Sequence, residues 1–171
     1  MENFMNIARK RENLTLIALA VCVAAAFFVT WNSYKRYSSL IPFDSETFCQ
    51  GAACENSDHC VDVVKNNKNS VYVAGWAFIR GHENVMFKNK FVIYNVPTGK
   101  YYYANIKCMK RPDVSRAFAI DGKIPNYDNS GFLATLKKDT IKLAGLNKFY
   151  IAYDDGVSKC LIDLNLTLDI Q

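Results

Sequence analysis

Histidine is scarce in this chain, and no recognisable catalytic motif accompanies it. Among 171 residues there are two histidines, His59 and His82. Neither lies in a pattern such as Gly-x-Ser-x-Gly or His-Glu-x-x-His, and no phosphate-binding glycine loop is present. Asp154 and Asp155 precede Gly156, which indicates a hairpin turn and not a pair of catalytic carboxylates. We therefore expect no enzymatic activity, no catalytic residue and no cofactor.

A long run of one charge sign is also missing. The 21 basic and 16 acidic residues give a formal net charge of +5, and the excess is diffuse. This distribution argues against a nucleic-acid partner, which would need a basic stripe. A composition that is 50% hydrophobic and 13% aromatic is too rich in core-forming residues for disorder. The length allows one sizeable domain together with a membrane anchor.

One segment near the N-terminus has no charged residue. It runs from Leu14 to Trp31, and its 18 residues would span about 27 Å as a helix, close to the thickness of a bilayer core. The basic cluster at residues 9–11 precedes it, and Trp31 and Tyr34 suit the lipid–water interface. We predict a basic cytoplasmic tail (residues 1–13) and a transmembrane helix (14–31). The remaining residues would then lie on the outer side of the membrane.

A cleaved signal peptide is the main alternative to this anchor. Residues 24–26 are three alanines after an apolar stretch, as a cleavage site requires. The apolar run continues beyond them through Phe27 and Phe28, which favours an uncleaved anchor. A lipoprotein signal is not favoured, because Val21 precedes Cys22 where a small residue is needed. We expect Cys22 to be a packing residue of the helix.

Beyond the anchor, the spacing of cysteines indicates an oxidising compartment. They are Cys49, Cys54, Cys60, Cys108 and Cys160. Cys108 shares strand parity with Ile106, and Cys160 with Ile162, so both thiols should point inward. We predict a disulfide between Cys108 and Cys160, two buried free thiols being the alternative. The other three cysteines lie beside His59, but they lack the Cys-x2-Cys spacing of structural zinc sites, and we expect no metal site.

Short β-branched and aromatic runs separated by turn residues dominate the chain after residue 70. The expected strands are Val71–Ile79, Lys90–Val96, Lys100–Met109, Gly131–Lys137, Lys148–Tyr153 and Ser158–Ile170. Only Asp113 to Phe118 looks briefly helical, with Asp113 as its N-cap. This pattern predicts a mainly β fold, an antiparallel, Ig-like β-sandwich at residues 70–171. Residues 32–69 show no sustained period and are interpreted as a cysteine-containing stalk.

Two tyrosines on the expected strand Lys100–Met109 form a candidate ligand-binding surface. Tyr101 and Tyr103 have the parity opposite to Cys108, and Asn105 and Lys107 continue the same face. Tyrosines flanked by amide and amine donors can stack on sugar rings. The same residues could equally form cross-strand pairs that only stabilise a sheet.

Three short motifs occur in a fixed order along the β-rich part. They are Gly75-Trp76-Ala77-Phe78, Arg111-Pro112-Asp113-Val114 and Asn129-Ser130-Gly131-Phe132. Their order resembles a small extracytoplasmic β-sandwich module that is attached to bacterial membrane glycosyltransferases and surface-polysaccharide synthesis proteins. The resemblance covers residues 71–170, and its motifs imply a fold more than an active site. The cysteine-rich stalk and the single anchor depart from the pattern of that module.

The anchor and the β-rich pattern predict a membrane-anchored extracytoplasmic binding or accessory module. The resemblance implies a connection with envelope polysaccharide and a location in the inner membrane of a bacterium. The expected partners of this module are the lipid bilayer and, following the resemblance, a surface polysaccharide or a membrane glycosyltransferase. The alternative is a pilin-like structural subunit, because Leu14 to Ala18 is similar to the start of a pilin assembly helix. However, Asn13 and Ala18 stand where pilins carry glycine and glutamate.

Overall fold

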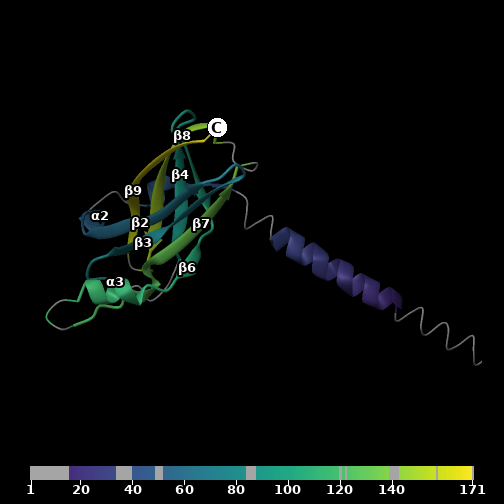
Figure 1. Cartoon of the computed structure of the whole chain (residues 1–171), viewed down its shortest axis with the longest axis horizontal. Helices are drawn as coiled ribbons and strands as arrows, with labels where there is room; N and C mark the ends of the chain where they lie inside the picture. The colour runs from purple at the N-terminus through teal and green to yellow at the C-terminus, as the bar shows by residue number, and fades with distance from the viewer. Residues whose placement is uncertain are drawn as a thin grey trace, which may run out of the picture. The chain divides into compact units, whose positions relative to one another are not determined.

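A computed structural model of the chain describes residues 16–33, 40–48, 52–83, 88–119, 121, 123–138, 143–156 and 158–170. The chain divides into two compact units, residues 1–37 and residues 38–171 (Figure 1). The first contains an apolar helix, Leu16–Ser33. The second is built mainly from β-strands. Each unit is described by itself below.

The β-rich unit has two sheets, in which all described strand pairs are antiparallel. The five-stranded sheet has, in spatial order, β1 (Ile41–Pro42), β5 (Lys100–Ala104), β4 (Lys90–Asn95), β8 (Gly145–Asp154) and β9 (Lys159–Ile170). The four-stranded sheet has β2 (Ser57–Asn66), β3 (Ser70–Ile79), β7 (Gly131–Lys137) and β6 (Lys107–Met109). The short helices are η1 (Ser45–Thr47), α2 (Ala52–Glu55), α3 (Pro112–Ala117) and η2 (Asp128–Ser130).

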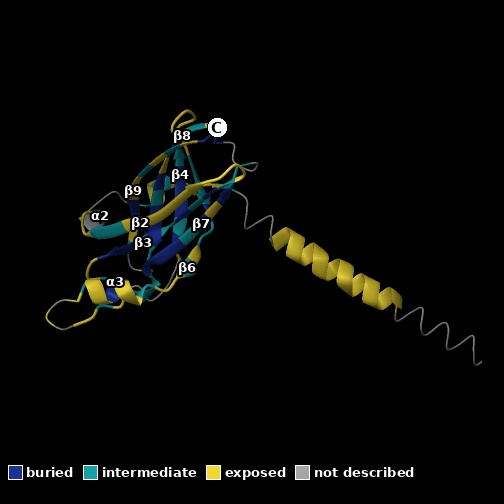
Figure 2. Cartoon of the chain, viewed as in Figure 1, coloured by how far each residue is buried: buried dark blue, intermediate teal, exposed yellow. Residues whose placement is uncertain are grey.

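One hydrophobic core joins the two sheets. It contains inward residues of both sheets, and the rings of Phe91 on β4 and Phe132 on β7 lie 6.2 Å apart between them. Phe91 also packs against Phe149 of β8, with ring centroids 5.4 Å apart. Buried residues follow the middle of β3, β4 and β7, whereas turns are exposed (Figure 2). Because side chains alternate along a strand, burying one face leaves the other available for solvent or ligand.

The last strand confirms the alternation expected from the sequence. Ile162, Leu164 and Ile170 are buried in the core, and the intervening Asp163 and Asp169 are exposed. The alternation of inward and outward side chains continues on both sides of a bulge in β9. Phe149 pairs with Leu166 whereas Tyr150 pairs with Asp163, which leaves two residues of β9 without a partner on β8. An insertion of two residues keeps every later side chain on its original face.

The prediction of a stalk at residues 32–69 is wrong for the second half of that segment. Residues 57–66 form β2, which pairs with β3 over its whole length, so the four-stranded sheet begins before residue 70. β2 is an edge strand that is mostly exposed on both faces from Cys60 onward, so it lacks an alternating apolar pattern. Its register also shifts between Val61 and Val63, which interrupts the period of two.

The expected strand Lys100–Met109 is two strands in different sheets. β5 ends at Ala104 and pairs with β4, whereas β6 starts at Lys107 and pairs with β7. The chain therefore crosses from one sheet to the other through Asn105 and Ile106. Both strands have the same parity, so the sequence pattern does not reveal the crossing.

The helical segment was predicted correctly, but its cap was not. Pro112 occupies the first helical position, where a missing N–H is tolerated, and Arg111 holds the N-cap position without a side-chain cap. The carboxylate of Asp113 instead accepts hydrogen bonds from Arg111, at 2.7 Å from Nη2. These bonds lower the pKa of Asp113. Arg111 also pairs with Asp62 of β2, so it links α3 to the edge of the sheet.

The disulfide prediction is corrected by the structure, which joins Cys160 to Cys54 and not to Cys108. Cys160 is fully buried on β9, as its parity implied. Cys108, however, lies on β6, at the far edge of the four-stranded sheet. The other edge strand, β2, contacts β9, and α2, directly before β2, brings Cys54 within 5.6 Å (Cα–Cα) of Cys160. Cys49 lies outside the described residues.

Gly75 permits an unusually close approach of β2 to β3. A Cβ atom at this position would overlap the carbonyl oxygen of Cys60 and touch the ring of Phe132. The absence of a side chain at Gly75 therefore lets β2 pair with β3 beside its bulge.

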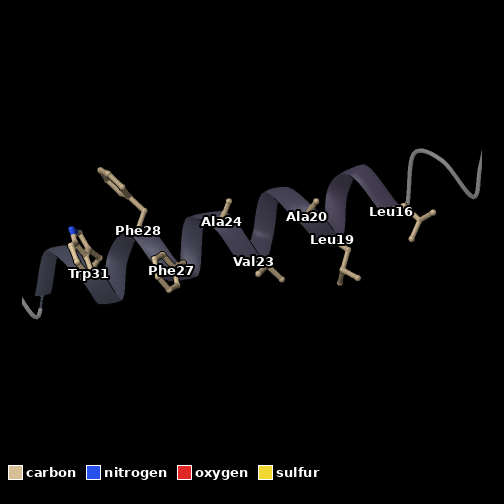
Figure 3. Close-up of a pocket in the computed structure, with 8 residues that line it drawn as sticks. All are labelled: Leu16, Leu19, Ala20, Val23, Ala24, Phe27, Phe28 and Trp31. Carbon is tan, nitrogen blue, oxygen red and sulfur yellow. The ribbon is translucent and has the colours of Figure 1, made fainter.

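The helix Leu16–Ser33 is apolar on every side. Its large side chains are all at least half exposed, from 50% for Trp31 to 69% for Phe27. Figure 3 shows such side chains projecting from opposite sides of the helix. The described helix is long and apolar enough to cross a membrane, although a signal sequence meets the same criterion. Leu14 and Thr15, on which the predicted helix start and the pilin resemblance depend, lie outside the described residues.

Removal of the Cys54–Cys160 disulfide should lower the free energy of unfolding by about 2–4 kcal/mol, because a cross-link between distant residues restricts the unfolded chain. The two cysteines are 106 positions apart. Denaturant unfolding of the full chain in detergent, carrying Cys54→Ala and Cys160→Ala, measures the loss. Cys60→Ser, which changes an exposed free thiol, is the control. A non-reduced digest that links Cys160 to Cys108 would contradict the pairing.

Gly75→Ala should lower the free energy of unfolding of the β-rich unit by about 1–3 kcal/mol, the usual cost of overpacking. The added methyl group would meet the main chain of β2, which cannot move aside as a flexible side chain can. Ala74→Ser adds one atom at the neighbouring, half-buried outward position and should change stability much less. Thermal unfolding of both variants tests this. Equal melting temperatures would show that β2 does not approach Gly75 this closely.

Candidate functional site

The structure separates the four residues of the predicted ligand surface. Tyr101 and Tyr103 lie on β5 and share the outward face of the five-stranded sheet. Asn105 lies in the crossing between the sheets, and Lys107 is on β6 of the four-stranded sheet. The two tyrosines are therefore brought together as expected, but Lys107 belongs to the other sheet.

Tyr103 is part of a small outer hydrophobic cluster. Its ring meets the ring of Phe43 edge-on at 6.2 Å, and the ammonium group of Lys90 lies 4.2 Å from its centroid. Phe43 and Phe48 pack against Val92 and neighbouring residues of the sheet. This geometry makes Tyr103 a residue that holds the segment before α2 onto the sheet.

The segment Phe43–Phe48 covers only part of the outward face. It carries η1, whose first N–H groups are capped by Asp44, and its two phenylalanine rings pack together at 5.2 Å. The covered part includes Val92 and Leu161. Towards the ends of β4 and β8 that carry Tyr94 and Lys148, the described structure shows no such cover.

Three tyrosines from adjacent strands lie at this side of the face, and we call them the tyrosine platform: Tyr94, Tyr101 and Tyr150. Tyr101 and Tyr150 also pack against the outer cluster around Val92. Tyr94 on β4 pairs directly with Tyr101 on β5, and their ring centroids are 4.6 Å apart. Tyr101 and Tyr150 of β8 are 6.3 Å apart. All three are half-buried, so each ring is supported by the sheet and still reaches the surface.

Polar side chains border the tyrosine platform. Lys148 pairs with Tyr94 on one side and with Thr167 on the other, and Asp163 pairs with Tyr150. Directly paired residues of an antiparallel sheet point to the same face, so these groups lie beside the rings. Lys148, Asp163 and Thr167 are exposed. The surface thus combines flat aromatic rings with hydrogen-bond donors and acceptors.

The environment of the platform disfavours ionisation of two of its phenols, those of Tyr101 and Tyr150. Burial, with a smaller contribution from the Asp163 carboxylate, raises the pKa of Tyr150 to about 12. Burial and the neighbouring Tyr94 raise the pKa of Tyr101 as well. The hydroxyls of Tyr101 and Tyr150 therefore stay protonated and can donate hydrogen bonds.

Tyr94 and Tyr150 were missed from the sequence, although a signal for them existed. Both lie within expected strands, and Tyr94 alternates with the buried Phe91, Ile93 and Asn95. Parity alone would have placed them outward. Their proximity to Tyr101 depends on the order β5-β4-β8, which parity does not give.

A second concave surface lies beside α3. It has a volume of about 630 Å³, and its lining includes Arg80, Glu83, Phe118, Lys123 and Tyr127. The guanidinium of Arg80 lies 5.5 Å from the Phe118 ring, and Gly81 N–H donates to the Tyr127 hydroxyl. Its lining mixes acidic, basic and apolar groups, which does not select one ligand class.

His82 forms a contact between two loops of the β-rich unit. Its Nδ1 is 2.9 Å from Asp155 Oδ2, and the same carboxylate accepts a hydrogen bond from Ser158 N–H. The pair holds the connection after β3 against the turn between β8 and β9. Within the described part of the chain there is no group of three or more metal-binding side chains.

Comparison of the chain with protein-family profiles, curated protein sequences and solved structures gave no match in any of the three. The function therefore has to be inferred from the surfaces themselves.

The raised pKa of Tyr150 should make the protein less stable between about pH 10 and pH 12. Folding favours the neutral phenol, so this contribution is complete below the unfolded pKa near 10 and is lost as pH rises towards the folded value of about 12. Unfolding free energies measured across this range should fall less steeply for Tyr150→Phe. Asp163→Asn should shift the absorbance titration of Tyr150 to lower pH. An identical pH dependence in wild type and Tyr150→Phe would contradict this environment.

Proposed function

We propose that this chain is a membrane-anchored, non-enzymatic module that binds polysaccharide of the bacterial envelope through the tyrosine platform. The observation that carries the proposal is the grouping of Tyr94, Tyr101 and Tyr150 on the outward face of the five-stranded sheet. The helix Leu16–Ser33 serves as the anchor, and the β-rich unit is extracytoplasmic, on the outer side of the inner membrane.

The tyrosine rings suit a sugar for a physical reason. The C–H faces of a pyranose ring are apolar, and they stack on an aromatic ring, whereas its hydroxyls need hydrogen-bond partners at the edge. The platform supplies both, because Lys148 and Asp163 lie beside the rings. Since the rings are packed into the sheet, little side-chain entropy is lost on binding.

The disulfide supports the outward location. Cys54 and Cys160 pair in the structure, and disulfides persist mainly in oxidising compartments such as the periplasm. The apolar and exposed helix is consistent with an anchor, because a helix that is apolar on all sides is stable in lipid and not in water.

Substitution of both Tyr94 and Tyr101 by alanine should weaken binding to a neutral polysaccharide by about tenfold or more, the sum expected for two lost aromatic contacts. Affinity electrophoresis of the full chain in uncharged detergent, through gels containing a β-glucan, a mannan or a galactan, measures this. The double Tyr→Phe variant keeps the rings and should retain most of the binding.

Tyr103→Ala is the matched control, because it removes a tyrosine of the same strand that supports Phe43 instead of the platform. It should lower thermal stability and leave retardation in the gel unchanged. The proposal fails if the double alanine variant is retarded like the parent, or if none of the three polysaccharides retards the wild-type protein.

A further inference from the structure

Two exposed aliphatic side chains, Val96 and Leu146, adjoin the tyrosine platform, and we call them the aliphatic pair. Val96 is 38% exposed and Leu146 is 42% exposed. The N–H of Val96 donates to the carbonyl oxygen of Leu146 at 3.0 Å, so the ladder between β4 and β8 continues by one residue beyond β4. Side chains two positions apart on a strand share a face. Val96 therefore lies next to Tyr94 on the outward face. For the same reason, Leu146 lies next to Lys148.

Buried amide groups hold the chain on both sides of the aliphatic pair. Asn95 and Asn147 are 1% and 0% exposed, and Asn95 Nδ2 donates to Asn147 Oδ1 at 3.1 Å. Asn95 Oδ1 accepts hydrogen bonds from the N–H and the hydroxyl of Thr98. Gly145 has a φ of +93°, and a Cβ atom there would lie 2.9 Å from Pro97 Cγ. The two turns that flank the aliphatic pair are thus packed together, which reduces the entropy that a ligand must remove on binding.

Polar groups of two kinds border the aliphatic pair. Lys148 is exposed two positions along β8 from Leu146, and Asp169 of β9 pairs directly with Leu146 and is also exposed. An ammonium group donates hydrogen bonds, and a carboxylate accepts them. Neighbouring strands are about 4.8 Å apart, and two residues along a strand span about 6.6 Å. An apolar contact, a donor and an acceptor therefore occur together beside the rings.

An acetamido group on a sugar has the same three features. Its methyl group is apolar, its carbonyl oxygen accepts a hydrogen bond and its N–H donates one. The methyl carbon lies about 3.8 Å from the ring carbon that carries the nitrogen, because a trans amide separates them as it separates successive Cα atoms. A sugar ring stacked on Tyr94 can therefore place the methyl group on the next row of side chains, about 6.6 Å away. A hydroxyl in the same position is too short to reach that row.

We propose that the tyrosine platform and the aliphatic pair together bind a polysaccharide that contains N-acetylated amino sugars. The sugar ring stacks on Tyr94, and the acetyl methyl group packs on Val96 and Leu146. Lys148 donates a hydrogen bond to the acetyl carbonyl oxygen, and Asp169 accepts one from the amide N–H. The inference rests on the proposed function, which it deepens by naming the class of sugar.

Two soluble oligosaccharides that differ in one substituent test this inference. Chitohexaose carries an acetamido group on each sugar, and cellohexaose carries a hydroxyl at the same position of the same β-linked backbone. Titration calorimetry uses the full chain in an uncharged detergent without sugar head groups. Chitohexaose should bind at least about fivefold more tightly, because burial of one methyl group alone strengthens binding by about fourfold. Equal affinities for the two oligosaccharides would overturn the inference.

Substitution of the aliphatic pair should remove this preference. Val96→Ser with Leu146→Ser should lower the affinity for chitohexaose to that for cellohexaose and change the affinity for cellohexaose by less than about twofold. The matched control is Val63→Ser with Met109→Ser, because these side chains are similarly exposed, at 37% and 41%, on the four-stranded sheet. The control should keep both affinities. A preference that persists without the aliphatic pair, or an equal loss in the control, would contradict the inference.

A milder variant keeps the inference testable if the serine variant does not fold. Lys148→Met retains an aliphatic stem at an exposed position and removes the donor. It should reduce the preference for chitohexaose by about threefold or more, the effect of one lost hydrogen bond. An unchanged preference would contradict the assigned role of Lys148.

Failure of this inference is distinguishable from failure of the proposed function. Absence of binding to chitohexaose would overturn the inference alone, because the polysaccharide gels test the platform separately. Substitution of Tyr94 and Tyr101 by alanine should weaken binding of both oligosaccharides. If that double variant bound both as wild type does, the platform itself would not be the site, and the proposed function would fail with the inference.

Discussion

The two sheets bury one shared set of inward side chains between them. This burial determines which side chains of each strand point outward and are available for other contacts. Phe91 and Phe132 meet between the sheets, and Phe91 also packs on Phe149. Once these residues point inward, their neighbours in each strand must point outward. The outward positions of the tyrosines on one sheet and of Lys65 and Lys107 on the other are therefore consequences of the same core.

The outward faces differ because different segments cover them. On the five-stranded sheet, Phe43 and Phe48 pack over Val92 and Leu161, beside the tyrosine platform. On the four-stranded sheet, Trp76 and Phe78 stack together at 5.6 Å and are covered by Phe118 at the end of α3. Each face thus has a shielded aromatic part that adds stability.

Sequence periodicity was sufficient for the strands with one buried face and insufficient elsewhere. β3, β7 and β9 begin and end within one residue of the expected bounds, because their alternation is strong. β2 was missed because an exposed edge strand with a bulge has no such alternation. The parity of Cys160 was interpreted correctly, but its partner was not. Inward orientation is shared by many residues, and it does not say which of them are neighbours.

The amino-acid sequence by itself determined the apolar N-terminal helix, the outward orientation of Tyr101 and Tyr103, and the inward orientation of Cys160. These properties depend on residues close together in the chain. Only the tertiary structure decided that Cys54 is the partner of Cys160, that Tyr94 and Tyr150 join Tyr101, and that Lys107 lies on the opposite sheet. Those relations follow from the spatial order of the strands. That order is set by packing across the whole core, which no local period encodes.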